Sequence, residues 1–287
     1  MALQLGLFVN PSAERYRETL AIVEAAERGG LDLIGIQDHP YQRRFLDTFA
    51  LIGDLLARSS RLRFFPAVAN LPLRHPAMLA KQAATLDVMS GGRFELGLGA
   101  GALYDRIATM GGPRLSPRES VDALEEAIAI IRAGFAGGQK VDFEVEHYQL
   151  EGWEAGPPPA HRIGIWLGAY RPRMLRITGR LADGWLPSLG YMKPPQLAEA
   201  RKRVDEAAER AGRDPAEVLG IYNVSGELTD GARGEGPLDG PPEHWVETLA
   251  RWAEELSLGA VLMPAESLEQ VETLINEVAP GLRAATG

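Results

Sequence analysis

Eight short apolar segments alternate with eight longer amphipathic segments along the chain. The apolar segments lack the alternation of a strand with one wet face, so they are typical of parallel strands covered on both faces. The amphipathic segments have the spacing of surface helices, about 3.6 residues per turn. Eight such repeats predict an α/β fold, a single (β/α)8 TIM barrel. The predicted strands are residues 3–9, 32–37, 62–68, 93–98, 163–167, 184–187, 218–224 and 260–263, and the predicted helices are residues 15–28, 48–58, 76–89, 117–135, 171–181, 194–211, 242–256 and 268–278.

Several of these helices carry start and stop signals. Ser116, Pro117 and Glu119 match a capping box with a proline in the first helical turn. Glycine pairs at 29–30 and 91–92 follow two helices, where glycine commonly ends a helix. These signals support helix boundaries near those positions.

Interruptions of the repeat predict insertions after the fourth and seventh strands. Residues 99–115 are longer than an ordinary strand-to-helix loop, so we expect a functional loop or a lid. Two alternating runs, 141–144 and 147–150, predict a small hairpin before the fifth strand. Residues 226–242 are rich in glycine, proline and acidic residues, and we expect them to be mobile.

Composition narrows the class of protein. A length of 287 residues suits one α/β barrel, so residues 1–287 are predicted to form one domain. The chain lacks a long apolar run and a signal-peptide pattern, which predicts no association with a membrane. Zero cysteines fit the cytoplasm and exclude thiolate chemistry. A net charge of −9 argues against binding to nucleic acid, although a local anion site at a helix N-terminus is compatible with it.

Two titratable residues end the second predicted strand, at the edge where TIM barrels carry their active sites. Asp38 and His39 are adjacent, so on a continuing strand only one of them faces the barrel mouth. His39 is the best candidate for a general acid or base, because an imidazole titrates near neutral pH. From these residues alone, an equally good interpretation is that Asp38 caps the next helix and His39 packs on the rim.

Pro66 and two groups of glycines mark further positions at the same edge. Proline cannot donate to the ladder, so Pro66 predicts a bulge in the third strand. Residues 97–102 match the dinucleotide pattern G-x-G-x-x-A only formally, and their glycines can instead let a flat ring or a phosphate approach the backbone. A helix is expected just after Gly168, where free N–H groups with Arg171 or Arg173 would suit a phosphate. Solvated surface charge is the alternative for both arginines.

Metal and serine chemistry find little support. The five histidines show neither H-x-H nor H-E-x-x-H spacing, so no metal site is predicted. Ser12, Ser188 and Ser225 lie in no nucleophile-elbow motif, which argues against a serine hydrolase. His75 is expected to serve at the start of the third helix.

Motifs along nearly the whole chain resemble those of the bacterial luciferase-like monooxygenase superfamily, and within it the branch of oxidoreductases that use coenzyme F420. The matching segments are Gly30-Leu31-Asp32, Gln37-Asp38-His39, Arg74-His75-Pro76, Thr85-Leu86-Asp87, Gly91-Gly92-Arg93-Phe94, Leu96-Gly97-Leu98-Gly99-Ala100-Gly101, Val141-Asp142-Phe143, His147-Tyr148-Gln149-Leu150, Gly179-Arg180-Leu181-Ala182-Asp183-Gly184-Trp185 and Pro280-Gly281-Leu282-Arg283.

This resemblance implies a flavin-type ring at the barrel mouth, with coenzyme F420 exchanging a hydride with a small organic substrate. It implies a cis peptide bond in the bulge of the third strand, expected between Ala67 and Val68. Asp38 and His39 are the implied catalytic residues, with Asp38 near the ring and His39 toward the substrate. The residues implied to bind the cofactor are Asp38, Ala67, Val68, Asn70, Gly99, Ala100, Gly101, Gly168, Ala169 and Tyr170.

The chain departs from the family pattern at two places. Ala102 stands where some F420-dependent sugar-phosphate dehydrogenases have a glutamate, and Tyr170 and Arg171 occupy a loop that usually holds small residues. A sugar phosphate is therefore not the expected substrate. A hydrophobic or aromatic substrate is weakly favoured by aromatic residues near strand ends, with core or rim packing as the alternative; these residues are Tyr41, Phe45, Trp166, Trp185 and Tyr191.

Two further functions remain open at this point. The first is an FMN-dependent monooxygenase of the same superfamily, in which reduced FMN activates oxygen. The second is a flavin-binding protein of this fold without turnover, against which the retained Asp38-His39 pair and the glycine rim argue. In each case we expect a homodimer that acts on a small molecule.

Overall fold

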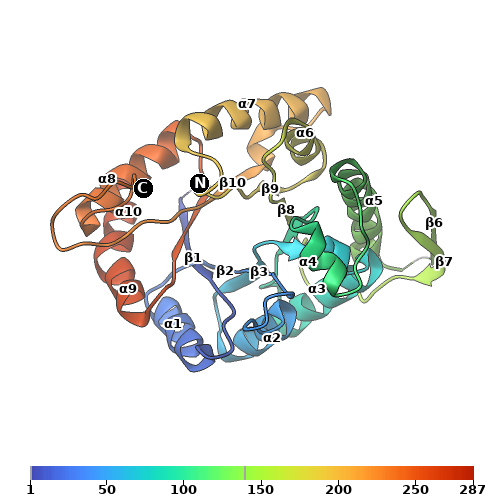
Figure 1. The fold of residues 1–287 in the computed structure, drawn as a ribbon, viewed down its shortest axis with the longest axis horizontal. Helices are drawn as coiled ribbons and strands as arrows, with labels where there is room; N and C mark the ends of the chain where they lie inside the picture. Colours follow the sequence, from blue (N-terminus) through green and yellow to red (C-terminus); the bar gives the residue numbers. More distant parts are fainter. Residues whose placement is uncertain (1, 139) are drawn as a thin grey trace.

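The computed structural model describes residues 2–138 and 140–287. Figure 1 shows strands at the centre, enclosed by helices, with one hairpin projecting from the side. The central strands are β1 (Gln4–Val9), β2 (Leu33–Ile36), β3 (Arg63–Pro66), β4 (Ala69–Asn70), β5 (Leu96–Gly99), β8 (Ile165–Leu167), β9 (Gly184–Trp185), β10 (Leu219–Asn223) and β11 (Ala260–Pro264). The helices are α1 (Tyr16–Arg28), α2 (Thr48–Arg58), η1 (Leu71–Leu73), α3 (Pro76–Ser90), α4 (Tyr104–Thr109), α5 (Pro117–Ala136), α6 (Pro172–Leu181), α7 (Pro194–Arg210), η2 (Pro215–Glu217), α8 (Pro242–Glu255), α9 (Leu268–Thr273), η3 (Leu274–Val278) and α10 (Ala279–Thr286).

The central strands form a nearly closed parallel barrel. Their order is β3-β2-β1-β11-β10-β9-β8-β5-β4, so the two ends of the sheet are the two halves of the third predicted strand. β3 pairs with β2 and β4 pairs with β5, while an isolated bridge between Phe64 and Phe94 joins the remaining edges. Eight strand positions around a ring confirm the predicted TIM barrel.

The third strand is broken where Pro66 predicts it. Pairing with β2 ends at Pro66 and pairing with β5 begins at Ala69. The peptide bond between Ala67 and Val68 is cis, as the resemblance implied. The two halves of the strand therefore face different neighbours on either side of residues 67–68.

Apolar side chains fill both faces of the barrel strands, which explains their unbroken hydrophobic pattern. One cluster draws almost entirely on strand residues and packs inside the barrel, and a larger one joins the strands to the helices outside. The inner cluster consists of Leu33, Phe65, Trp166, Leu186, Ile221, Ala260 and Leu262. Trp166 and Trp185 are buried in these clusters, so neither is a rim residue open to a substrate.

The long connection after β5 and the hairpin before β8 are both present, but their secondary structure differs in part from the prediction. The long connection after β5 contains the short helix α4. The hairpin consists of β6 (Lys140–Glu144) and β7 (Gln149–Glu154), so its second strand starts two residues later than predicted and runs further. The cause is that His147 and Tyr148 pack toward helices: the His147 N–H donates to Glu126, and the Tyr148 ring meets His75 edge-on.

Helix ends follow the sequence signals closely. Ser116 and Glu119 form the reciprocal capping box. Gly91 takes the left-handed conformation, and in the pair at 29–30 it is Gly30 that does so. The last helix runs beyond residue 278 to Thr286, because the proline after Ala279 falls in a first helical turn, where its missing N–H costs nothing. None of the described helices is long and apolar enough to cross a membrane.

Candidate functional site at the barrel mouth

The carboxylate of Asp38 ties the end of β2 to the broken third strand. Asp38 is 2% exposed. Its Oδ2 accepts from the backbone N–H of Asn70 at 2.9 Å, and its two oxygens accept from Arg74 Nε and Nη2 at 3.1 and 2.9 Å. Both oxygens are thus engaged, so this carboxylate is arranged to hold neighbouring groups in place.

Arg74 is the cation paired with Asp38, and the sequence analysis did not predict this contact. Besides Asp38, it pairs with Asp47 at 2.9 Å and lies 4.3 Å from the centre of the Phe49 ring. The motif Arg74-His75-Pro76 carried the signal, but only its role in starting a helix was read from it. That role is confirmed for His75, whose Nδ1 accepts from the N–H of Ala77.

His39 follows Asp38 and faces a different environment. Its Nδ1 is hydrogen-bonded to the hydroxyl of Tyr41, and the two rings meet edge-on with centroids 5.3 Å apart. Burial lowers the pKa of His39, while the charge of Asp38 acts in the opposite direction. Within the described residues no hydrogen bond engages Nε2, so the ring offers this nitrogen to a ligand.

Val68 is the point where three predicted cofactor-binding loops meet. A Cβ atom added to Gly99 would lie 2.7 Å from Val68 Cγ2, and one added to Gly168 would lie 3.2 Å from the same atom. A Cβ on Gly97 would lie 2.0 Å from the carbonyl oxygen of Pro66. These glycines therefore allow β5 and β8 to pack against the bulge. This packing explains them without the approach of a ring or a phosphate.

Asn70 carries the clearest sign of a missing ligand. It is 6% exposed and pairs in register with Gly99, and its Oδ1 finds no hydrogen-bond partner in the described part of the chain. Buried polar atoms are almost always satisfied, so such an atom calls for a donor from outside the protein. A flavin-type ring, which offers an N–H edge, fits this residue set.

The loop after β8 is more occupied than the sequence suggested. The N–H of Gly168 donates to Leu98, and the carbonyl of Ala169 accepts from the indole of Trp185. Helix α6 starts at Pro172, which has no N–H, and Arg173 is paired with Asp122 on α5. A phosphate there would depend on the N–H groups of residues 169–170 and on the exposed Arg171.

Tyrosines border the mouth on the side of β9. Tyr170 is half-buried, burial raises its pKa, and its ring packs 5.4 Å from that of Tyr191. Tyr191 is 81% exposed, which is unusual for so large an apolar surface. Of the aromatic residues expected near the substrate, Tyr191 is therefore exposed, Tyr41 and Phe45 are half-buried, and Trp166 and Trp185 are buried.

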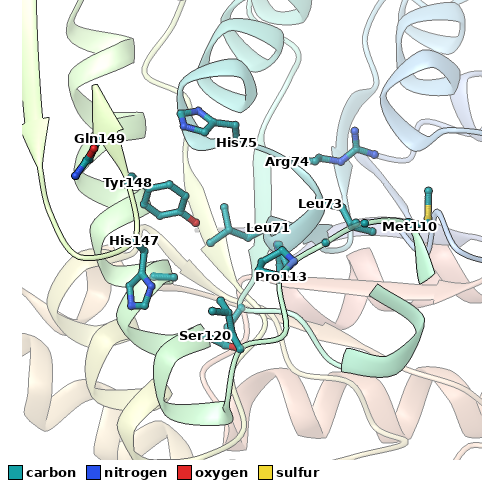
Figure 2. Close-up of a pocket in the computed structure, with 16 residues that line it drawn as sticks. Leu71, Leu73, Arg74, His75, Met110, Pro113, Ser120, His147, Tyr148 and Gln149 are labelled. Carbon is teal, nitrogen blue, oxygen red and sulfur yellow. The ribbon is translucent and has the colours of Figure 1, made fainter. Parts of the chain in front are cut away.

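A cavity of about 400 Å³ lies beside the mouth, between η1, the loop after α4 and the hairpin. Ala100 is the predicted site residue that lines it, while His39 and residues 168–170 lie outside its lining. Figure 2 shows the Tyr148 ring projecting toward Leu71, with His147 on the same wall. Burial raises the pKa of Tyr148 to about 12, so its hydroxyl remains a hydrogen-bond donor.

One group of side chains near this cavity has the composition of a cation site. In the described residues, Glu126, Glu146 and His147 place potential ligand atoms within 4.8 Å of one another. The Glu126 carboxylate already accepts the N–H of His147, and Glu146 is exposed. Exposed acidic groups often gather without an ion, so this group alone does not indicate a metal site.

Residues 3–225 match the model of the luciferase-like monooxygenase family, and the chain belongs to this family. It is 32% identical over 197 residues to the 5,10-methylenetetrahydromethanopterin reductase of Methanolobus tindarius, covering 67% of this chain and 56% of that protein. It is 29% identical to the F420-dependent glucose-6-phosphate dehydrogenase of Gordonia bronchialis, covering 95% and 88% of the two chains.

The fold agrees with this membership. The structure of an F420-dependent secondary alcohol dehydrogenase in complex with an F420-acetone adduct matches with a TM-score of 0.87 at 17% identity, covering 98% of this chain and 99% of that one. The matched region spans 63% of the length of several uncharacterized mycobacterial relatives, and little more than half of the reductase.

Proposed function

We propose that this protein is an F420-dependent oxidoreductase that transfers a hydride between the deazaflavin and a small organic substrate. When bound, the cofactor supplies a carbon that accepts or donates the hydride. The proposal is supported by relatives whose names specify F420 and by the residues at the barrel mouth. The observation that carries it is the Oδ1 of buried Asn70, which has no hydrogen-bond partner among the described residues.

The chain's own residues divide the work between holding and proton transfer. Ala67, Val68 and Asn70 would support the ring, and residues 99–101 and 168–170 would contact its phosphate-bearing chain. Asp38 and Arg74 hold these segments together. His39 Nε2 would give a proton to the substrate, or take one from it, as the hydride moves.

A titration of the apoprotein tests the cofactor. F420 and FMN are added separately, and binding is followed by visible absorbance and fluorescence. We expect F420 to bind preferentially, and Asn70→Ala to weaken its binding about fivefold or more, as loss of one buried hydrogen bond does. Preferential binding of FMN would replace this proposal with the FMN-dependent monooxygenase, and binding of neither would remove both.

A non-catalytic flavin-binding protein is the remaining alternative. It needs no proton donor, whereas the contact of His39 Nδ1 with Tyr41 leaves Nε2 without a hydrogen-bond partner among the described residues. Turnover distinguishes the enzyme from the binding protein. A binding protein forms the complex with the cofactor, but the bound cofactor is neither reduced nor oxidised by any carbonyl or alcohol tested.

Assembly and location complete the proposal. We propose that residues 1–287 act as one domain, as a homodimer in the cytoplasm, without nucleic acid as a partner. Support for the dimer comes from helix α3, whose outer face exposes Met78, Val88 and Met89. The lack of cysteine supports the cytoplasmic location. The acidic composition supports the absence of a nucleic-acid partner.

A further inference from the structure

We infer that Tyr41 positions His39 and keeps its imidazole able to take up a proton in a buried site. This inference rests on the proposed function, because it concerns how the proposed proton donor is controlled. Tyr41 lies two residues after His39, on the loop that joins β2 to α2, and its hydroxyl is the group hydrogen-bonded to Nδ1.

Hydrogen bonds within the loop between β2 and α2 fix the position of Tyr41 relative to His39. The N–H of Gln42 donates to the His39 carbonyl at 2.9 Å, and the N–H of Phe45 donates to the Gln42 carbonyl at 3.0 Å. The hydroxyl of Thr48 then fastens the start of α2 to the Gln37 carbonyl at 2.7 Å. Two successive turns thus fold Tyr41 back over the imidazole, where its ring stands at 79° to that of His39.

Other groups near His39 are not available for this task. Asp38 is the neighbouring carboxylate, but Arg74 and the N–H of Asn70 occupy its oxygens. Tyr191 raises the pKa of Tyr41 through its charge, but its own side chain is exposed to solvent. In the described part of the chain, Tyr41 supplies the hydrogen bond that orients the His39 ring.

A phenol suits a histidine that must change its protonation state. Burial, followed by the charges of Asp38 and Tyr191, raises the pKa of Tyr41, so its hydroxyl keeps its proton. This hydroxyl accepts from Nδ1–H, which makes Nε2 the nitrogen that is bare in the neutral ring and protonated in the charged ring. Because Nδ1 keeps its hydrogen bond in both forms, the ring can gain or lose the proton on Nε2 without turning.

The two hydrogen bonds are unequal, which sets the direction of the effect. A bond to the imidazolium is charge-assisted and about twice as strong as a bond to the neutral ring. Tyr41 therefore favours the charged form and opposes burial, which lowers the pKa of His39. Removal of the hydroxyl alone is expected to lower that pKa further.

Proton binding by His39 can be measured on the apoprotein without a substrate. The protein is labelled with ¹⁵N-histidine, and the five imidazoles are titrated by long-range ¹H–¹⁵N NMR, with His39 assigned from the signals lost in His39→Asn. In Tyr41→Phe we expect the proton-binding constant of His39 to fall about threefold or more, the size of one modest hydrogen bond. Tyr191→Phe, which removes a phenol hydroxyl of the same mouth, is expected to leave it unchanged.

An unchanged or raised pKa of His39 in Tyr41→Phe overturns the inference, and so does an equal fall in Tyr191→Phe. If Tyr41→Phe does not fold, the test is made on the unmutated protein. The inference then requires that the ¹⁵N chemical shift of Nδ1 in neutral His39 differ from that of free imidazole. A shift equal to that of free imidazole rejects the contact. Because neither cofactor is present, failure of F420 binding would reject the proposed function and leave this measurement independent.

Discussion

At the scale of single residues, Asp38 binds two distant segments through three hydrogen bonds, and we expect it to act as a structural anchor. Asp38→Ala leaves the largely buried Arg74 without its main partner, and breaking a buried ion pair costs about 3–5 kcal/mol. Urea denaturation measures the loss of unfolding free energy. Asp47→Ala removes the half-exposed partner of the same arginine and the cap of α2, and should cost about 1 kcal/mol. Equal losses in the two variants would contradict the anchor role.

His39 differs from Asp38 because no described residue is hydrogen-bonded to its Nε2. His39→Ala is expected to lower turnover by roughly 10²–10⁴-fold, as loss of a general acid or base does. The affinity for the cofactor should be nearly unchanged, because the residues that would hold the ring are on other strands. Steady-state kinetics and cofactor titration on the same preparation test both halves. A variant as fast as the parent, with the same pH profile, would make His39 a structural rim residue.

At the scale of elements, the contact between β5 and the bulge leaves no room for a side chain. Gly97→Ala places a methyl group against the Pro66 carbonyl, and overpacking of this kind costs about 1–3 kcal/mol. We expect a lower midpoint in urea and weaker cofactor binding, since Val68 and Asn70 must move. Gly190→Ala is the matched control, because a Cβ there meets no atom within 4 Å. If the two variants are equally stable, the bulge is more compliant than the contacts indicate.

The opposite end of the barrel carries a network of charged side chains around His161. His161 Nδ1 lies 2.7 Å from Asp87 on α3, and its Nε2 lies 3.4 Å from Glu95 just before β5. Glu95 also pairs with Arg63 and accepts the N–H of Gly164. The hydrogen bond and charge of Glu95, with those of Asp87, outweigh burial and raise the pKa of His161.

A raised folded-state pKa stabilises the protein below the pKa of the unfolded histidine, and this contribution disappears as the pH rises through the folded-state value. From about pH 6 to about pH 9, the unfolding free energy of the parent should therefore fall relative to that of His161→Gln. Urea titrations of both proteins across this range provide the measurement. Parallel curves would mean that folding does not change the pKa of His161.

At the scale of the whole molecule, helix α3 is the face most suited to a second copy of the chain. Met78 and Met89 are 58% and 74% exposed and lie three turns apart on one side of the helix. Met89→Glu should convert the expected dimer to a monomer, measured by light scattering after size exclusion. Met110→Glu, which changes an exposed methionine outside α3, should not. A parent that is monomeric at all concentrations would reject the dimer.

The barrel itself was predictable, because periodicity and burial are properties of each segment. A strand covered on both faces must be apolar throughout, as β2 and β11 are, and a helix at the surface must be amphipathic. The break at Pro66 and the capping box at Ser116 were predictable for the same reason, since each depends on local backbone chemistry. The resemblance then assigned the cis bond and the Asp38-His39 pair to their places.

The contacts that these residues make could not be predicted from the sequence, because hydrogen bonds between distant segments have no periodicity along the chain. Asp38 and Arg74 are 36 residues apart and share two hydrogen bonds, a contact that no local pattern in the sequence indicates. The sequence predicted that the glycines at 97 and 99 lie at the rim of the barrel. Their close contact with the bulge in the third strand, which excludes a side chain, is visible only in three dimensions. Composition and pattern determined the barrel and the edge that holds the site; the packing of distant strands determined which polar atoms at that edge remain open.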